Sequence, residues 1–255
     1  PSITLDDLLK PGRRDFSMIE RQFTEFRVVV FYITLILVPL PSRMSLDHHF
    51  TVSSTLWSPP STLICFLSLA AVVMLAIVGA RRHRLLSFCG IWFLLHLALE
   101  SSIINLELAF EHRLYLPSVG FVIGAVWLTQ QYVRIPQAAK VALYSLVFCA
   151  AATGTFLRSP TWRDPLTLWA DCVAKAPDKA RPNNVYASYL MEAKKFDEAE
   201  PYLLQAIKVK PDYAYAHNGL GNLYRERDQS DLALVHYREA IIHKPGLAEA
   251  HFNIG

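Results

Sequence analysis

The chain has little charge for its length, which excludes several common classes of protein. Only 18% of its 255 residues are Asp, Glu, Lys or Arg, against about 25% in soluble domains. The formal net charge is +3, and no stretch is rich enough in Lys and Arg to follow a phosphate backbone, so we expect no nucleic acid as a partner. Hydrophobic residues make up 53% of the chain, and this excludes a largely disordered protein.

Cysteine is also scarce, and the signatures of soluble enzymes are absent. The four cysteines are Cys65, Cys89, Cys149 and Cys172. No pair has metal-binding spacing and three lie in apolar runs, so the sequence predicts neither a disulfide framework nor a metal site. There is no P-loop, GxGxxG, GxSxG or HExxH motif. We therefore expect no cofactor within these residues.

Long apolar runs are what the chain has in excess, and they are confined to its first 157 residues. Four runs approach the roughly 20 residues with which a helix crosses a bilayer: 61–80, 85–105, 116–133 and 138–157. From residue 158 onward charged residues become frequent. We expect an all-α protein, with a polytopic transmembrane helix bundle over 27–157 and a soluble region over 158–255.

The N-terminal part is harder to interpret. An apolar segment, 27–41, would reach only about 21 Å as a helix of fourteen apolar residues. It is either a short crossing or a re-entrant segment on the outer side. Residues 1–26 mix both charges and predict an exposed loop with a short helix. Because the chain starts at Pro1 without a signal peptide and stops at Gly255 within a repeat, we expect an internal fragment of a longer protein.

Positive charge predicts the orientation in the membrane. Arg81, Arg82 and Arg84 lie between the first two long runs, and Arg134 and Lys140 lie between the last two. By the positive-inside rule these connections face the cytoplasm. The soluble region then lies in the periplasm of a bacterium, with the spans in the inner membrane, or in the lumen of the endoplasmic reticulum of a eukaryote.

The soluble region contains a repeat. Pro177, Pro211 and Pro245 are 34 residues apart, which is the period of tetratricopeptide repeats, each a helix–turn–helix. The period predicts one repeat over 180–213, a second over 214–247 and a truncated third over 248–255. Residues 164–177 fill the second-helix position of a preceding unit and are expected to cap the stack. The fold prediction for 158–255 is an α-solenoid.

The concave face of such a stack commonly binds a protein or peptide. The residues that the register places there are Asn184, Ser188, Tyr215, Asn218, Asn222 and Arg225. The alternative is that these side chains are only solvated and that the repeats serve as a general scaffold.

Ionisable residues gather at the outer end of the second long run. Glu100, Glu107 and Glu111 share one helical face, and His112, Arg113 and Tyr115 follow. Charge so close to hydrocarbon suggests function. An Arg fork and an imidazole can hold a phosphate, with a carboxylate to orient them. The alternative is an interfacial cluster satisfied by water, with Tyr115 in the aromatic belt. A second outer candidate is the pair Asp47 and His48, in a structural or substrate-binding role.

These residues resemble a known family. The segment Glu111 to Ser118, EHRLYLPS, is similar to the Glu-x-x-x-Tyr-x-Pro-Ser motif of the transmembrane-and-tetratricopeptide-repeat proteins. Ser45 to Phe50 and Thr161 to Trp169 also resemble that family, and the pattern is closer to its bacterial branch. The resemblance covers roughly residues 22–255.

The resemblance implies membership of the GT-C glycosyltransferase superfamily. Eukaryotic members are protein O-mannosyltransferases that use dolichyl-phosphate mannose. It therefore implies sugar transfer from a polyprenyl-phosphate donor to a protein outside the cytoplasm, with the repeats binding the acceptor. In this superfamily the key acidic residue, a base or a contact to a divalent metal, lies in an outer loop that would precede Pro1. The catalytic residue is therefore unknown here, and the fragment alone is expected to be inactive. The alternative function is a non-catalytic membrane-anchored scaffold for envelope or pilus assembly.

Overall fold

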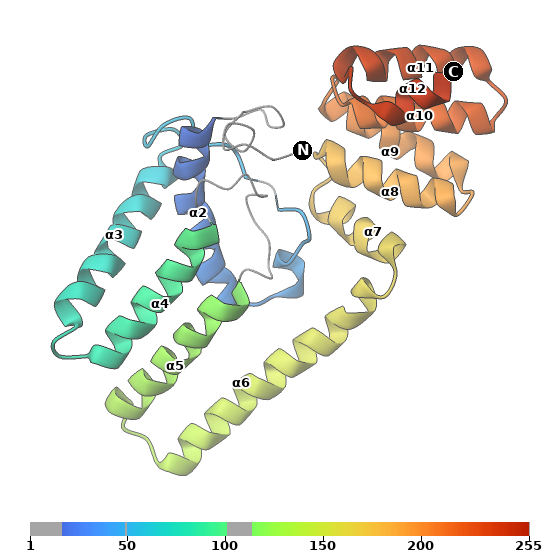
Figure 1. Cartoon of the computed structure of the whole chain (residues 1–255). Coiled ribbons are helices and arrows are strands. Elements are labelled where there is room, and N and C mark those ends of the chain that lie inside the picture. The colour runs from blue at the N-terminus through green and yellow to red at the C-terminus, as the bar shows by residue number, and fades with distance from the viewer. Residues whose placement is uncertain (1–16, 49, 101–113, 255) are drawn as a thin grey trace, which may run out of the picture. The chain divides into compact units, whose positions relative to one another are not determined.

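The computed structural model describes residues 17–48, 50–100 and 114–254. Within these ranges every regular element is a helix, so the all-α prediction is confirmed. The chain forms two compact units, residues 1–155 and residues 156–255, which we call the N-terminal and the C-terminal unit (Figure 1).

Consecutive helices of the N-terminal unit pack against one another. Helix α2 packs on α3, α3 on α4 and α4 on α5. By length and composition two segments could cross a membrane: Ser61–Gly79, with a mean hydropathy of 2.6, and Gln137–Trp162, with 1.5. Arg84–Ala98 is apolar but shorter. The helices of this unit, in order, are α2 (Met18–Leu37), α3 (Ser61–Gly79), α4 (Arg84–Glu100), α5 (Tyr115–Tyr132) and α6 (Gln137–Arg158).

Helix α2 is longer at its N-terminal end than we expected. Ser17 and Glu20 form a capping box, in which each side chain binds the other residue's backbone N–H, so the helix begins at Met18. Arg21 and Glu25 form an ion pair of 3.5 Å that is buried, not exposed in a loop. The apolar segment predicted from residue 27 is thus the second half of one continuous helix.

A buried polar chain fixes the α2–α3 connection. The backbone N–H of Ser53 donates to Thr24 Oγ1 at 2.8 Å, and the Ser53 hydroxyl lies 2.8 Å from that of Thr62. All three residues are fully buried. Because each polar group has a partner, burial there costs little, and α2 is tied to the start of α3.

The two basic connections lie at one end of the N-terminal unit (Figure 1). His83, in the turn between α3 and α4, places its ring 5.7 Å from that of Trp127 and 6.4 Å from that of Tyr132, near the end of α5. Lys140 Nζ donates to the Gln130 carbonyl at 3.1 Å across the α5–α6 turn. The positive charges that predict the orientation are therefore grouped in space as well.

Helix pairs with a 34-residue period build the C-terminal unit. Helices α8, α10 and α12 begin at Ala180, Ala214 and Ala248, each one period of 34 residues after the last. Helix α7 packs on α8, and the pairs α8–α9 and α10–α11 make the most extensive contacts of the unit. The helices are α7 (Pro165–Lys175), α8 (Ala180–Glu192), α9 (Phe196–Val209), α10 (Ala214–Glu226), α11 (Ser230–His243) and α12 (Ala248–Ile254).

The core of this unit repeats with the same period. Ala199, Leu203 and Ala206 of α9 are fully buried, and the residues 34 positions later are buried too: Ala233, Tyr237 and Ala240 of α11. Small residues on one helix face let the paired helices approach closely, so van der Waals contact and apolar burial hold each pair.

A polar side chain ties each proline turn to the helix that follows it. Asn183 Nδ2 donates to the Pro177 carbonyl at 2.8 Å. At the equivalent positions His217 Nε2 lies 3.0 Å from the Pro211 carbonyl and His251 Nε2 lies 2.8 Å from the Pro245 carbonyl. Since a carbonyl only accepts, both imidazoles carry a hydrogen on Nε2.

Candidate ligand-binding pocket

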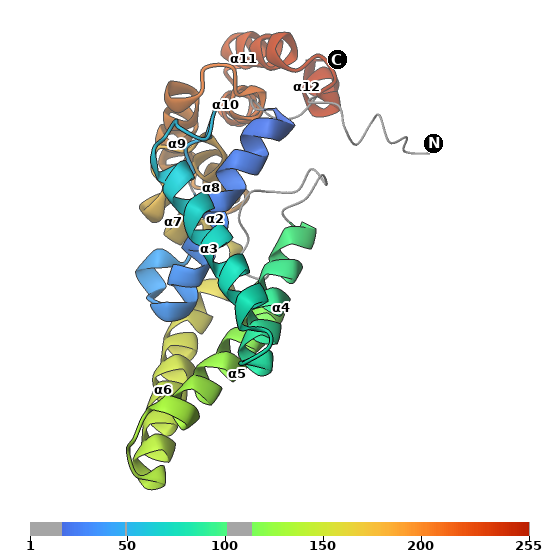
Figure 2. The same cartoon turned by 90° about the vertical axis from the view of Figure 1, so that its left-hand side faces the viewer.

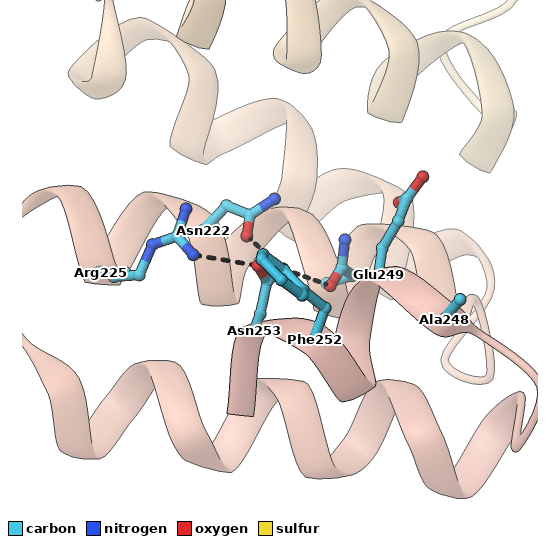
Figure 3. Close-up of a pocket in the computed structure, with 7 residues that line it drawn as sticks. Asn222, Arg225, Ala248, Glu249, Phe252 and Asn253 are labelled. Carbon is cyan, nitrogen blue, oxygen red and sulfur yellow. Dashed lines mark hydrogen bonds between the residues drawn. The ribbon is translucent and has the colours of Figure 1, made fainter. Parts of the chain in front are cut away.

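A pocket of about 440 Å³ lies between α10 and α12, the first helices of two successive periods (Figure 3). Successive turns of α10 form its floor, because residues three or four apart on a helix lie on the same face. The lining residues are Asn218, Asn222 and Arg225 of α10, with Ala248, Glu249, Phe252 and Asn253 of α12.

Amide groups form a connected network in this pocket. Asn253 Nδ2 donates to Asn222 Oδ1 at 2.9 Å and to Asn218 Oδ1 at 3.4 Å. Asn222 Oδ1 also accepts a hydrogen bond of 2.8 Å from the Tyr237 hydroxyl of α11. With its oxygen held from two sides, Asn222 has a defined amide orientation, and its Nδ2 group remains a donor toward the pocket.

The pocket edge carries charge of both signs and one aromatic ring. Arg225 Nη1 donates to Asn253 Oδ1 at 3.0 Å (Figure 3). The Phe252 side chain is largely exposed, and Glu249 is exposed beside it. Amides that both donate and accept suit the main chain of an extended peptide, and an Arg fork suits a carboxylate.

The structure brings three of the six predicted groove residues to this pocket, namely Asn218, Asn222 and Arg225. The others lie elsewhere in the unit. The Ser188 hydroxyl donates to the Asn184 carbonyl of its own helix at 3.0 Å. Tyr215 is exposed and lies under the Lys244 ammonium group, which is 4.2 Å from its ring centroid and hydrogen-bonded to its hydroxyl.

Asn184, another predicted groove residue, has a side-chain oxygen without a hydrogen-bond partner in the described part of the chain. This Oδ1 atom is buried. Asn184 and Asn218 occupy equivalent positions of successive periods, on α8 and α10. A buried acceptor without a partner is costly, and this oxygen is shielded from any ligand, because less than 1 Å² of it is exposed.

Most of the predicted phosphate-binding residues fall outside the described residues. These are Glu107, Glu111, His112 and Arg113. Glu100 is the last residue of α4 and Tyr115 the first of α5, so the segment 101–113 connects these two packed helices. Tyr115 is exposed at the start of its helix.

Asp47 and His48 lie in the connection that follows the short 3₁₀ helix η1 (Pro41–Arg43). The His48 ring lies 5.0 Å from that of Phe31 on α2, edge to face. Arg43 lies over the same Phe31 ring at 5.9 Å and donates to Thr34 Oγ1 at 2.6 Å. These contacts anchor the connection on α2. Across the described ranges no three His, Cys, Asp or Glu residues are placed to hold a metal ion.

Four pocket residues, Ala248, Glu249, Phe252 and Asn253, were not predicted as groove residues, although the period contains a signal for two of them. Phe252 lies one period after Asn218, and Glu249 lies one period after Tyr215. Asn218 and Tyr215 were both predicted to face the groove. Asn253 aligns with Gly219 and carries no such signal. It contributes because α12 lies beside α10 and presents its side chain to the α10 amides.

Comparison with known proteins gives partial matches. No model of a known protein family matches the chain. It is 30% identical over 144 residues to the protein O-mannosyl-transferase Tmtc2 of Drosophila melanogaster, a match that covers 54% of this chain and 15% of the relative. It is 29% identical over 129 residues to the protein O-mannosyl-transferase TMTC3 of Mus musculus, covering 50% and 14%. The human TMTC3 protein is 28% identical over 132 residues, covering 51% and 14%. The matched part is thus only about one seventh of the length of these relatives.

Proposed function

We propose that this chain is part of a membrane glycosyltransferase that moves a mannose-like sugar from a polyprenyl-phosphate donor to a protein on the periplasmic or lumenal side. The similarity to three protein O-mannosyl-transferases over about half of the chain is the observation that carries this proposal. The motif from Glu111 to Ser118 and the order of the two units agree with it.

The proposed architecture is a transmembrane bundle of the GT-C type followed by a solenoid of tetratricopeptide repeats. Two helices long and apolar enough to span a bilayer support the first part. The regular 34-residue spacing of helix starts supports the second. We keep the bacterial branch as part of the proposal, on the basis of His112 and Arg113 after Glu111.

The donor phosphate is assigned to the segment between α4 and α5. Arg113 binds phosphate oxygens with two parallel N–H groups, and His112 adds a further donor. Glu111 orients the two cations. Tyr115 packs at the lipid boundary, where an aromatic ring with a polar tip is favoured. Glu100, Glu107, Asp47 and His48 complete the outer surface.

The pocket of the C-terminal unit is assigned to the acceptor protein. Its amide network supports binding of peptide main chain, because the Asn222 and Asn253 side chains are held in place before a ligand arrives. The same feature is the observation that favours the second candidate function, a membrane-anchored scaffold. Three of the five polar side chains that line the pocket are neutral amides, which supports binding without chemistry.

Sugar transfer in isolated membranes tests the proposal against the scaffold. Membranes carrying the full-length protein are given radiolabelled mannose either as polyprenyl-phosphate mannose or as a nucleotide sugar, with membrane proteins as acceptors. We expect label on protein from the polyprenyl-phosphate donor only. No label from either donor, at normal expression, would leave the scaffold as the function. Transfer from the nucleotide sugar alone would show that the donor is a nucleotide sugar and not a polyprenyl-phosphate sugar.

Cysteine accessibility in intact cells tests the sidedness. His83→Cys lies in the basic turn between α3 and α4, and Asp228→Cys lies in the turn between α10 and α11. A membrane-impermeant thiol reagent should label the protein with Cys at position 228 above the background of the four native cysteines, and not the protein with Cys at position 83. The opposite pattern would invert the topology.

A further inference from the structure

The two basic turns of the N-terminal unit hold exposed positive charge on helices that contain almost no acidic residue. Arg81, Arg82 and Arg84 lie at the α3–α4 turn and Arg134 lies at the α5–α6 turn; all four are exposed. None of them forms an ion pair within the described part of the chain. Along α3, α4, α5 and α6 the only Asp or Glu is Glu100, at the opposite end of α4 from Arg84. The four helices themselves thus supply no counter-ion at this end.

Aromatic contacts hold the two turns together. The His83 ring, in the α3–α4 turn, lies 5.7 Å from that of Trp127 and 6.4 Å from that of Tyr132. The rings of Trp127 and Tyr132 are 6.1 Å apart, edge to face. Arg84 directly follows His83. Since Arg134 lies only two residues after Tyr132, the ring contacts bring two arginines of different turns near one another. In both views the two turns lie at the same end of the unit (Figures 1 and 2).

Exposed apolar surface runs up to these turns. Ile77 and Val78, in the last turn of α3, are 63% and 74% exposed, and Val133 and Ile135, on either side of Arg134, are each 40% exposed. Helix α3 is long and apolar enough to cross a bilayer, and only 11% of its apolar window is buried. Apolar surface followed by amphipathic rings and then arginines is typical of a helix that passes from hydrocarbon into the headgroup layer. Lipid headgroups are therefore the surface that adjoins both turns.

We propose that this basic end of the N-terminal unit binds the headgroup of an anionic phospholipid, with Arg84 and Arg134 as the contacts to its phosphate. A guanidinium group has parallel N–H donors that match two oxygens of one phosphate. Two arginines from different turns hold the headgroup from two sides, and the other cations of the turns raise the positive potential around it. The rings of Trp127 and Tyr132 pack where the headgroup meets the acyl chains.

Positive charge without a counter-ion favours an anionic lipid over a zwitterionic one. The ammonium group of phosphatidylcholine neutralises its phosphate, whereas phosphatidylglycerol carries a net negative charge. Each basic residue near a membrane surface adds to the attraction of anionic lipids, and this attraction falls off within a Debye length. Because both turns adjoin the headgroup layer, their cations lie within that range. The interaction requires insertion of this unit in a bilayer and is independent of sugar transfer.

Native mass spectrometry of the whole 255-residue chain, released from a non-ionic detergent, measures the binding of single lipid molecules. The wild-type chain should bind phosphatidylglycerol about tenfold or more tightly than phosphatidylcholine with the same acyl chains. Arg84→Gln together with Arg134→Gln should weaken the binding of phosphatidylglycerol by about tenfold or more and leave that of phosphatidylcholine unchanged. Arg84→Lys together with Arg134→Lys should lose less affinity, because both charges stay and only the guanidinium forks are removed.

Arg163→Gln together with Arg238→Gln is the matched control, because it also removes two exposed arginines, both from the C-terminal unit. It should leave the affinity for both lipids unchanged. Equal affinity of the wild-type chain for the two lipids, or equal losses in the two Gln double variants, would overturn the proposal. Displacement of phosphatidylglycerol by inorganic phosphate at the same concentration would overturn it in favour of a soluble anion. Far-ultraviolet circular dichroism confirms that each variant is folded.

Discussion

Gly221 on α10 lies directly against the ring of Tyr237 on α11. A Cβ atom at position 221 would lie 2.4 Å from Tyr237 Cε1 and 2.5 Å from Cδ1, closer than two carbon atoms can approach. One period earlier the same two positions hold Ala187 and Leu203, both fully buried. The pair with the larger side chain on its second helix, Tyr237, thus has the smaller residue on its first helix, Gly221. The Tyr237 hydroxyl in turn orients Asn222 in the pocket.

Gly221→Ala should therefore destabilise the α10–α11 pair by roughly 1–3 kcal/mol, because the added methyl group overpacks a rigid ring. Hydrogen exchange of the whole chain, read at the amides of α10 and α11, measures the local free energy of opening. The double variant Gly221→Ala with Tyr237→Leu reproduces the pair found one period earlier and should recover most of the loss. Equal protection in wild type and Gly221→Ala would show that this contact is not tight.

Arg227 joins two helix pairs through two carboxylates of very different exposure. Its Nη1 donates to Glu200 Oε2 at 2.7 Å and its Nη2 to Asp197 Oδ1 at 2.6 Å. The Asp197 side chain is 98% exposed, whereas that of Glu200 is 27% exposed and also accepts from the Tyr224 hydroxyl at 3.0 Å. The hydrogen bond from Arg227 is the main cause that lowers the pKa of Glu200 below its ordinary value.

Glu200→Gln should cost about 1 kcal/mol of the stability of this contact, and Asp197→Asn less than about 0.5 kcal/mol, since water screens the exposed pair. Because the pKa of Glu200 is lowered in the folded chain, its contribution is present above the ordinary carboxyl pKa and is lost as the pH falls through the folded value. Hydrogen exchange at the amides of α9 and α10 in both variants shows which substitution costs more stability. A larger effect of Asp197→Asn would contradict it.

Two histidines face one another between α10 and α11. His217 carries a hydrogen on Nε2, toward Pro211, and its Nδ1 faces His236 Nδ1 at 3.5 Å. Burial, followed by the charge of His217, lowers the pKa of His236 below its ordinary value of 6.5, while Glu239 acts in the opposite direction. Tyr224 of α10 stacks on the same ring, and His243 of α11 lies near His217.

Acid should therefore loosen this helix pair. With a lowered pKa in the folded state, the unfolded chain takes up the proton first, so stability falls as the pH drops from about 6.5 toward the folded value. His236→Gln should lessen this loss between about pH 7.5 and about pH 5.5, measured by hydrogen exchange against wild type at each pH. His251→Gln is the control, since it removes a histidine from an equivalent turn. A pH response unchanged in His236→Gln but changed in His251→Gln would contradict the assignment.

The sequence predicts the periodic part of the structure well, because the period repeats a physical constraint. Ala187 and Gly221 are small where paired helices cross, and helices α8, α10 and α12 begin one period apart, at Ala180, Ala214 and Ala248. Alignment by period also placed Asn218 and Asn222 on the face where the pocket lies. Binding of a ligand there stays a prediction.

The capping of helices and the contacts between side chains of different helices were harder to predict from the sequence. Hydrophobicity alone started the first helix near residue 27, although the capping box of Ser17 and Glu20 begins it at Met18. The role of Asn253 depends on the approach of α12 to α10, which no single-helix pattern contains. The predicted phosphate contacts at Glu111 and Arg113 lie outside the described residues and stay predictions.

Sugar transfer by variants of Arg113 tests whether the segment between α4 and α5 binds the donor phosphate. The rate of label transfer from polyprenyl-phosphate mannose to protein is measured in membranes with equal amounts of full-length wild type, Arg113→Lys, Arg113→Ala and the control Arg82→Ala. We expect a moderate loss of transfer in Arg113→Lys, which keeps the charge but not the guanidinium fork. We expect a loss of about 10- to 1000-fold in Arg113→Ala and no change in Arg82→Ala. Wild-type transfer by Arg113→Ala would contradict the assignment of the donor phosphate to this segment.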